Sequence, residues 1–393
     1  MREVRSAPLD EQAVEAFRSE LPALKSVAYL NTGTSGPMPI VVADAMTAEI
    51  DEQRDTPRLG ADRGERVREL KRSTRLAIAK CLGCDAEEIA LTHNTTEGMN
   101  FATLGVNWQP GDEAVTTNVE HPGALYPLYA ARERFNITIK TAAVAGKDPE
   151  ACVEQITRQL SSRTKLVSLS HVSFQTGQLL PIHQICDAAH AVGALVLVDG
   201  AQTFGAIPLD MDSLGCDAYA VSGQKWLCGP EGSGALFVRQ EVVSQLRIVF
   251  AAYGTMEGHN DYGGFQVRGN AQRFEQGTTN PAEIAGQLAA VRWLADNVGI
   301  DRASERSYAL AEHTIAKMKE RGLAVETPSS HAGLVTASLG GSDADLAVRA
   351  LREQSISIRS IRQLGAVRLS LGFFNTYEEI DTCVEAIDAV LRP

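Results

Sequence analysis

The chain has 393 residues, of which 44% are hydrophobic and 22% charged, and its formal net charge is −12. This length allows about two to three domains with a sizeable core, and the composition excludes disordered and membrane-spanning classes. The negative charge argues against nucleic acid or a membrane surface as the partner. Seven cysteines without a disulfide-framework spacing, and a charged start without an apolar signal core, predict a cytoplasmic protein.

The N-terminal two thirds predict an α/β fold. A short amphipathic helix is expected before residue 25, a strand and a Gly/Pro loop lead to Pro39, and residues 40–82 read as two helices. From residue 88, helical patterns alternate with seven apolar runs, which predicts a mainly parallel seven-stranded sheet with covered faces. The runs are EIALT, EAVTT, ITIKTAAV, KLVSLS, ALVLVD, AYAVSG and GALFV.

The last third predicts a smaller α+β domain. A long amphipathic helix over 281–298 leads into it, and residues 300–393 read as helix, strand, strand, helix. We therefore expect an N-terminal segment (1–30) that packs on the small domain, a large domain (31–280), and a linker helix with the small C-terminal domain (281–393). The Gly- and Tyr-rich stretch 250–272 is ambiguous in structure and is placed to form a lid.

One acid and one lysine follow two of these apolar runs. Asp199 ends ALVLVD, and Lys225 stands 26 residues later in the turn Ser-Gly-Gln-Lys-Trp. The acid is expected at the carboxyl edge of a buried parallel sheet, where open α/β sheets bind ligands. A partly desolvated lysine can form a Schiff base, and a buried acid can keep a pyridine nitrogen protonated. This pair predicts an enzyme that uses pyridoxal phosphate.

The segment LTHNTTEGMN predicts a phosphate site at the start of a helix. Asn94 with Glu97 three residues later has the form of a capping box. The first N–H groups of that helix, with the hydroxyls of Thr95 and Thr96, form an anion site at its positive end. Ser222 and Gln224 flank the lysine and can add donors.

Further candidates follow other strands. His121 precedes a Pro-Gly turn, where its ring can stack on a cofactor ring and assist proton transfer. Gln175 and Gln202 follow strands of the same sheet, and either can bond a phenolic oxygen. Arg359, Arg362 and Arg368 offer cations for a substrate carboxylate; Arg368 lies inside a strand pattern, where a guanidinium needs an anionic partner. A structural salt bridge is the alternative.

Other features predict packing rather than chemistry. Cys81 and Cys84 form a lone CxxC without a second pair, and the histidines lack zinc-protease spacing, so no metal is expected. Cys228 is expected to pack near the lysine, and the basic stretch 63–75 to be a solvated helix face.

Taken together, these motifs resemble the class V branch of the fold-type I pyridoxal phosphate enzymes. That group contains cysteine desulfurases, cysteine/cystine C–S lyases and isopenicillin N epimerases. The resemblance follows chain order over nearly the whole sequence: NTGTSGPMP, THNTTEG, EHPG, SFQTGQ, VLVDGAQ, SGQKWL, RFEQGTTN, HAGLV and AVRLSLGFFNT.

The resemblance implies a role for each candidate and a homodimer with a shared active site. Lys225 would bind the cofactor's aldehyde, Asp199 its pyridinium nitrogen and His121 its ring face. Substrate carboxylate would meet Arg368 and Arg359, with the Asn31–Thr34 loop closing over it. The other cofactor contacts would be Gln175 and Gln202 at the phenolic oxygen, and Thr95, Thr96, Ser222, Gln224 and the neighbouring subunit's Thr278 at the phosphate.

Three departures bear on the reaction. Most relatives have His where this chain has Gln224, and often Asn where it has Gln175. Desulfurases carry a nucleophilic cysteine just before the terminal arginine strand, whereas residues 358–367 contain none. We therefore expect a C–S lyase that acts on cysteine, cystine or a related amino acid by α,β-elimination to pyruvate, ammonia and a sulfur product. An epimerase or aminotransferase is the alternative within enzymes, and a non-catalytic relative is the alternative outside them.

Overall fold

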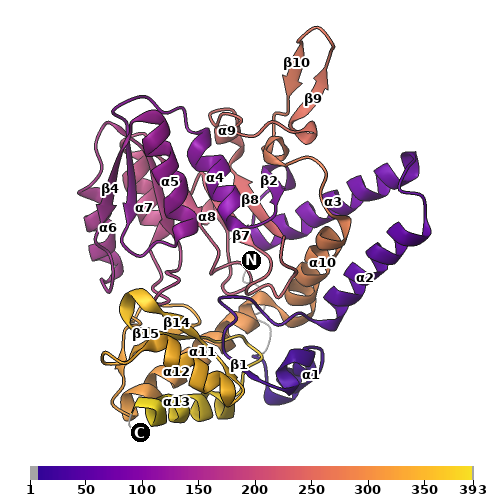
Figure 1. The fold of residues 1–393 in the computed structure, drawn as a ribbon. Coiled ribbons are helices and arrows are strands. Elements are labelled where there is room, and N and C mark those ends of the chain that lie inside the picture. The colour runs from indigo at the N-terminus through magenta and orange to yellow at the C-terminus, as the bar shows by residue number, and fades with distance from the viewer. Residues whose placement is uncertain (1–7, 392–393) are drawn as a thin grey trace.

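The computed structural model describes residues 8–391, so the first seven residues of the predicted N-terminal segment lie outside it. Its large part is built on a seven-stranded sheet in the order β2-β8-β7-β6-β5-β3-β4 (Figure 1). All neighbouring strands run parallel except β8, which is antiparallel to both of its neighbours. This confirms the predicted mainly parallel sheet. The strands are β2 (Ile89–Thr92), β3 (Glu113–Thr117), β4 (Thr138–Ala142), β5 (Thr164–Ser170), β6 (Leu195–Asp199), β7 (Ala218–Ser222) and β8 (Gly234–Val238).

Helices cover both faces of this sheet. Successive residues of β6 show it, since Val196 and Val198 pack in one apolar cluster and Leu197 packs in the other. The first cluster includes α3 (Ala61–Leu82), α6 (Pro149–Thr157), α7 (Ile182–His190) and α10 (Pro281–Arg292); the second includes α4 (Thr95–Gly105) and α5 (Pro122–Phe135). α2 (Ile40–Asp55) packs on α10, and the short α8 (Met211–Leu214) and α9 (Gln240–Val243) follow β6 and β8. Burial on both faces explains why these strands read as continuous apolar runs.

The C-terminal part has more elements than the sequence predicted. α10 continues through a wider π turn (Trp293–Val298), and Gly299, with φ 86°, separates it from α11 (Ile300–Glu320). A four-stranded antiparallel sheet follows in the order β11-β12-β15-β14. The predicted order of helix, strand, strand, helix was wrong, because it lacked α12 and three short strands. Each of these strands has only two or three residues, which is too few to show an alternation of apolar and polar residues. The elements are β11 (Ala324–Val325), β12 (Leu334–Ser338), α12 (Ala344–Glu353), β13 (Ile356–Ser357), β14 (Arg359–Ile361), β15 (Ala366–Ser370) and α13 (Tyr377–Leu391).

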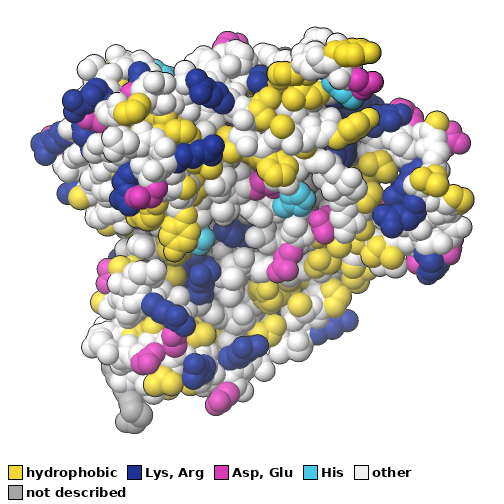
Figure 2. Space-filling model, turned by 45° about the horizontal axis from the view of Figure 1, so that its top comes forward, with side chains coloured by type: hydrophobic (Ala, Val, Ile, Leu, Met, Phe, Trp, Pro, Cys, Tyr) yellow, Lys and Arg dark blue, Asp and Glu magenta, His cyan; other side chains and the backbone are white. Residues whose placement is uncertain are grey.

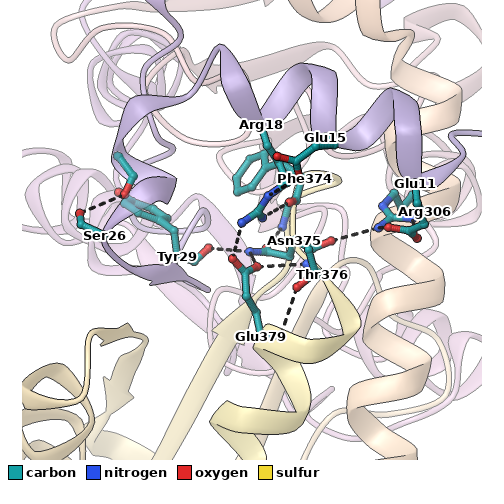
Figure 3. Close-up of polar contacts among 12 residues, drawn as sticks. Glu11, Glu15, Arg18, Ser26, Tyr29, Arg306, Phe374, Asn375, Thr376 and Glu379 are labelled. Atoms are coloured by element: carbon teal, nitrogen blue, oxygen red, sulfur yellow. Dashed lines mark hydrogen bonds and ion pairs between the residues drawn. The ribbon is translucent and has the colours of Figure 1, made fainter.

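The N-terminal segment is tied to this smaller part (Figure 3). The predicted helix is α1 (Glu11–Ser19), capped by Asp10, and a 3₁₀ turn over Pro22–Lys25 follows it. Arg18 donates to the Phe374 carbonyl at 2.6 Å and to the Glu379 carboxylate at 2.8 Å. β1 (Ala28–Tyr29) then pairs in parallel with β13. These contacts hold residues 31–36 against the small part; the domain boundaries at residues 30 and 280 stay a prediction.

Residues 250–272 contain a hairpin that projects from the large part (Figure 1). Its strands are β9 (Met256–His259) and β10 (Phe265–Val267), and the side chains of Tyr262 and Phe265 are exposed. None of the helices within residues 8–391 combines the length and apolar character that a membrane crossing requires.

Candidate active site

The start of α4 and the end of β7 form a small cradle. Asn94 caps α4 by accepting a hydrogen bond from Glu97 N at 2.9 Å, while the Glu97 carboxylate accepts from His93 N. Gly234, which opens β8, pairs with Thr92 on one side and Ser222 on the other. A Cβ atom at Gly234 would lie 2.9 Å from Asn94 Cα, so only glycine allows the backbones to approach this closely.

Three polar atoms around this cradle are buried without a hydrogen-bond partner: Thr95 Oγ1, Ser222 Oγ and Gln224 Oε1. Buried polar atoms are normally paired, and an unpaired one costs about 1–3 kcal/mol. Two of the three are hydroxyls, which can donate to an anion at the positive end of α4. These residues therefore fit a phosphate group. Thr96 starts the same helix, and its hydroxyl lies against Gly123 at the start of α5.

Lys225 lies three residues beyond β7 in a turn that buries its amine. Burial lowers the pKa of Lys225 to about 8, while Asp199 acts in the opposite direction. An amine with this pKa is partly neutral near physiological pH and can act as a nucleophile or base. The lysine was predicted in this environment, and the structure provides it.

Asp199 ends β6 and is 6% exposed. Its Oδ1 accepts a hydrogen bond from Ala201 N at 2.9 Å. The carboxylate faces the same edge of the sheet as Lys225, to which it is electrostatically coupled. This arrangement suits a carboxylate that holds the protonated nitrogen of a bound ring.

His121 opens α5 beside these groups. Its Nδ1 accepts from Gly123 N at 3.0 Å, and the Phe174 ring packs edge-on against it at 4.9 Å. Burial, Lys225 and two arginines lower the pKa of His121, although Asp199 raises it. The lowered pKa favours the neutral ring, in which Nδ1 accepts this bond and Nε2 carries the proton.

Two arginines converge where the small part faces these residues (Figure 2 shows dark-blue Lys and Arg side chains gathered along this junction). Arg368 in β15 is fully buried and pairs across the sheet with Arg359 in β14. Both donate to the Thr34 hydroxyl, at 3.2 and 3.3 Å, and Thr34 donates to Asn31 Oδ1 at 2.7 Å.

Arg368 also donates to the Phe174 carbonyl at 2.6 Å, but its Nε has no partner. Burial and the neighbouring Arg359 lower the pKa of Arg368 to about 9. Among the described residues neither arginine forms an ion pair, so the salt-bridge alternative is wrong. A carboxylate supplied from outside the chain would relieve this buried charge.

Gln202 links two segments that the sequence did not connect. Its Nε2 donates to the Gly33 carbonyl at 2.9 Å, and its Oε1 accepts from Trp226 Nε1 at 2.8 Å. Gly36 N donates to the Gln224 carbonyl at 2.7 Å, and a Cβ atom on Gly36 would collide with the Lys225 carbonyl. Residues 31–36 are thus clamped onto the lysine turn, which the residue pattern missed because about 190 residues separate the partners.

The remaining candidates lie at the edges of this site. The Gln175 carbonyl accepts from the Thr336 hydroxyl at 2.6 Å, and its half-buried side chain stays a predicted contact of the phenolic oxygen. Thr278 is exposed in the loop before α10, as a residue for a neighbouring subunit would be. The roles assigned to individual residues stay predictions.

A buried carboxyl behind His121 escaped the sequence analysis. Glu120 accepts from the Thr117 hydroxyl at 2.5 Å and from the Ser170 hydroxyl at 2.6 Å, and Ser170 pairs with Asp199 across β5 and β6. Burial raises the pKa of Glu120 to about 7, against the effect of the two hydroxyls. Its only sequence signal is its place between a strand end and His121.

The segment before β15 is short and contains no thiol. β14 is followed by a 3₁₀ turn over Arg362–Leu364 and by Gly365, with φ 55°, which leads directly into β15. The cysteine nearest in sequence to the lysine is Cys228, which is buried, and burial raises the pKa of its thiol to about 12. A thiol with this pKa is protonated at neutral pH and is a poor nucleophile.

The sequence profile of the class-V aminotransferases matches residues 28–383. The chain belongs to the class V aminotransferase family. It is 29% identical to a probable cysteine desulfurase of Mycolicibacterium paratuberculosis, over 95% of this chain but only 58% of that protein. It is 27% identical to a probable cysteine desulfurase of Methanothermobacter thermautotrophicus, over 96% and 98% of the two chains.

The fold of this class V chain is also similar to that of solved structures. The cystine C–S lyase C-DES, in complex with its reaction product cysteine persulfide, has a TM-score of 0.88 and 26% identity, over 94% of this chain and 99% of that one. A C-DES variant with glycine linked covalently to its pyridoxal phosphate has a TM-score of 0.89 and 26% identity, over 94% and 98%.

These similarities confirm the fold-type I architecture and an enzyme that uses pyridoxal phosphate. They agree with the cradle at α4, which offers unpaired donors for a phosphate, and with the buried amine of Lys225, which can bind an aldehyde.

Proposed function

We propose that this class V enzyme cleaves the C–S bond of cysteine, cystine or a related sulfur amino acid by α,β-elimination, giving pyruvate, ammonia and a sulfur product. The observation that carries this choice is the short turn over 362–364, which holds no thiol to take up sulfur. The curated relatives named desulfurases and the C–S lyase structure support cleavage of this bond.

Each group has a task in such a reaction. When bound, pyridoxal phosphate supplies an aldehyde for the amino group and a ring that takes up the charge left on Cα. Asp199 holds the proton on the ring nitrogen. Arg368 and Arg359 bind the α-carboxylate, which fixes the Cα–H bond toward Lys225. The cradle around Thr95 binds the phosphate.

Lys225 is the group that transfers the proton. Its neutral Nζ takes the proton from Cα, and the Cβ–S bond then breaks with its electron pair leaving on sulfur. Water completes the release of pyruvate and ammonia. No protein thiol takes part, in agreement with the raised pKa of Cys228.

The proposal includes a homodimer in the cytoplasm. Thr278 is exposed in the loop before α10, and the aromatic side chains of Tyr253, Tyr262 and Phe265 are exposed within residues 250–272. Such side chains are typical of surfaces that a second subunit covers. All seven cysteines are free, as expected in a reducing compartment.

The test is a product assay with cofactor-loaded protein, offered cysteine, cystine and S-ethylcysteine, in which pyruvate and the sulfur product are measured together. We expect both in equal amounts. Exchange of α-deuterium into solvent without pyruvate would favour the epimerase or aminotransferase alternative. Absence of both reactions with every substrate would contradict the proposal.

A further inference from the structure

A cavity of ≈ 400 Å³ opens beside the site. One wall is formed by the start of α5 and the segment after β5, and the other by β14 and the turn that follows it. The lining residues are His121, Pro122, Phe174, Arg359, Ser360, Ile361, Arg362 and Gln363. The cavity is therefore shared by the predicted ring-stacking histidine, by Arg359 of the arginine pair, and by the turn over 362–364.

The outer end of this cavity carries a positive charge that takes no part in binding the α-carboxylate. Arg359 and Arg368 meet at the Thr34 hydroxyl, so one carboxylate bound there engages both. Arg362 is three residues further along, at the start of the 3₁₀ turn. Its guanidinium contacts Asp345 instead of meeting the other two at Thr34.

Arg362 is held in place by one neighbour. Its Nε lies 2.8 Å from Asp345 Oδ2, and Asp345 accepts a hydrogen bond from the Ser360 hydroxyl on its other oxygen. This contact uses the Nε side of the guanidinium, and neither terminal nitrogen donates a hydrogen bond to a side chain or carbonyl within residues 8–391. The side chain is 79% exposed, so an incoming anion reaches it without displacing packed groups. Gln363 next to it offers an amide donor.

We propose that Arg362 and Gln363 form a second anion subsite, which binds a carboxylate at the far end of the substrate's sulfur substituent. The preferred substrates are then S-substituted cysteines with a second carboxylate, of which cystine is one, rather than cysteine or S-alkylcysteines. This inference rests on the proposed C–S lyase function and names its substrate class. The turn that bears the subsite stands where the resemblance places the cysteine loop of desulfurases.

The test compares two substrates that differ only in the terminal group, S-carboxymethylcysteine and S-ethylcysteine. The wild-type holoenzyme should show a kcat/KM about tenfold higher for the acid, which is the size of a charge-assisted contact that is partly screened by solvent. Arg362→Gln should remove this preference by raising KM for the acid, and should leave kcat/KM for S-ethylcysteine unchanged. Arg349→Gln is the matched control, since Arg349 is exposed, acts on Asp345, and does not line the cavity.

Binding measurements distinguish a failure of this inference from a failure of the proposed reaction. Both compounds are also titrated into the holoenzyme by calorimetry. An acid preference that Arg362→Gln abolishes supports the subsite even where no pyruvate forms, in which case the lyase proposal alone fails. Equal affinities in the wild type, or an equal loss for both compounds in Arg362→Gln, would overturn the subsite.

Discussion

The two halves of the active site are built in opposite ways. The cofactor half consists of the strand ends at Thr92, Asp199 and Ser222 with the start of α4, and it is a buried edge of one sheet. The substrate half consists of residues 31–36, Phe174 and the strand pair β14–β15, and three distant segments meet there. In the proposed reaction the first would bind a cofactor shared by many enzymes, whereas the second would select the substrate.

The difference shows in how each half carries its charges. In the cofactor half Lys225 and Asp199 oppose each other, and the unpaired atoms are hydroxyl and amide oxygens. In the substrate half two guanidinium groups face each other without a carboxylate among the described residues. The substrate half is thus completed by its ligand, which implies that it holds a destabilising charge when empty.

The largest effect is expected from a substitution in the cofactor half. Lys225→Ala removes the base and should lower pyruvate formation at least about a thousandfold, since a positioned acid–base group contributes about 10²–10⁴. Steady-state assays on cofactor-loaded protein measure this loss. Lys165→Ala, at the exposed start of β5, is the control and should retain full activity. Retention of a tenth of the activity by Lys225→Ala would contradict the role of the lysine.

The next effect concerns the substrate half. Arg368→Met should lower kcat/KM about a hundredfold, because two charge-assisted hydrogen bonds to the carboxylate are lost. It should also raise the melting temperature of the ligand-free protein, since a buried cation without an ion pair is replaced by an apolar chain.

Arg306→Met is the matched control for stability. Arg306 is also buried but is paired with Glu11 at 3.0 Å and donates to the carbonyls of Phe373 and Asn375. Its replacement should lower the melting temperature. A lower melting temperature in both variants would show that the charge of Arg368 is compensated within the chain.

A smaller effect is the pH dependence of cofactor capture. Because the pKa of Lys225 is lowered to about 8, the neutral fraction of its amine rises about tenfold between pH 7 and pH 9. The rate at which cofactor-free protein takes up pyridoxal phosphate, followed by absorbance, should rise over this window and then level off. A rate that keeps rising toward pH 10.5 would mean that the amine is solvated.

The smallest effect is expected from Glu120. Its pKa is raised to about 7 from the ordinary 4.5, so the folded protein keeps a proton that the unfolded chain releases between these values. This contribution to stability is present below pH 4.5 and is lost as pH rises to 7. Glu120→Gln should therefore melt a few degrees above the wild type at pH 8 and close to it at pH 4.5. Equal melting temperatures at pH 8 would show that Glu120 ionises without cost.

Sequence predicted where the residues of the cofactor half lie in the fold, because they follow strands directly. Asp199 and Lys225 each stand at or just beyond an apolar run, and parallel strands bring such positions to one edge. For the substrate half, the residue pattern gave only single arginines, and the closing of the Asn31–Thr34 loop over them was implied by the family resemblance. The clamp of Gly36 onto Gln224 and the meeting of Thr34 with Arg359 depend on pairing between distant segments, which no local period records.

Small elements escaped for a related reason. β13 and β14 are two and three residues long, and the hairpin β9–β10 lies in a stretch where Gly and Tyr give no clear alternation. The local sequence around Glu120 does not indicate that it is buried. Its partner Ser170 is in the neighbouring strand β5, 50 residues away.

The fate of the carbon skeleton tests the central claim most directly. Holoenzyme is incubated with ¹³C-labelled cysteine and cystine, and the products are followed by NMR. Elimination without a protein thiol predicts labelled pyruvate and no labelled alanine. Labelled alanine as the main product would mean that sulfur is transferred to an acceptor thiol while the amino group is kept, and would contradict the account.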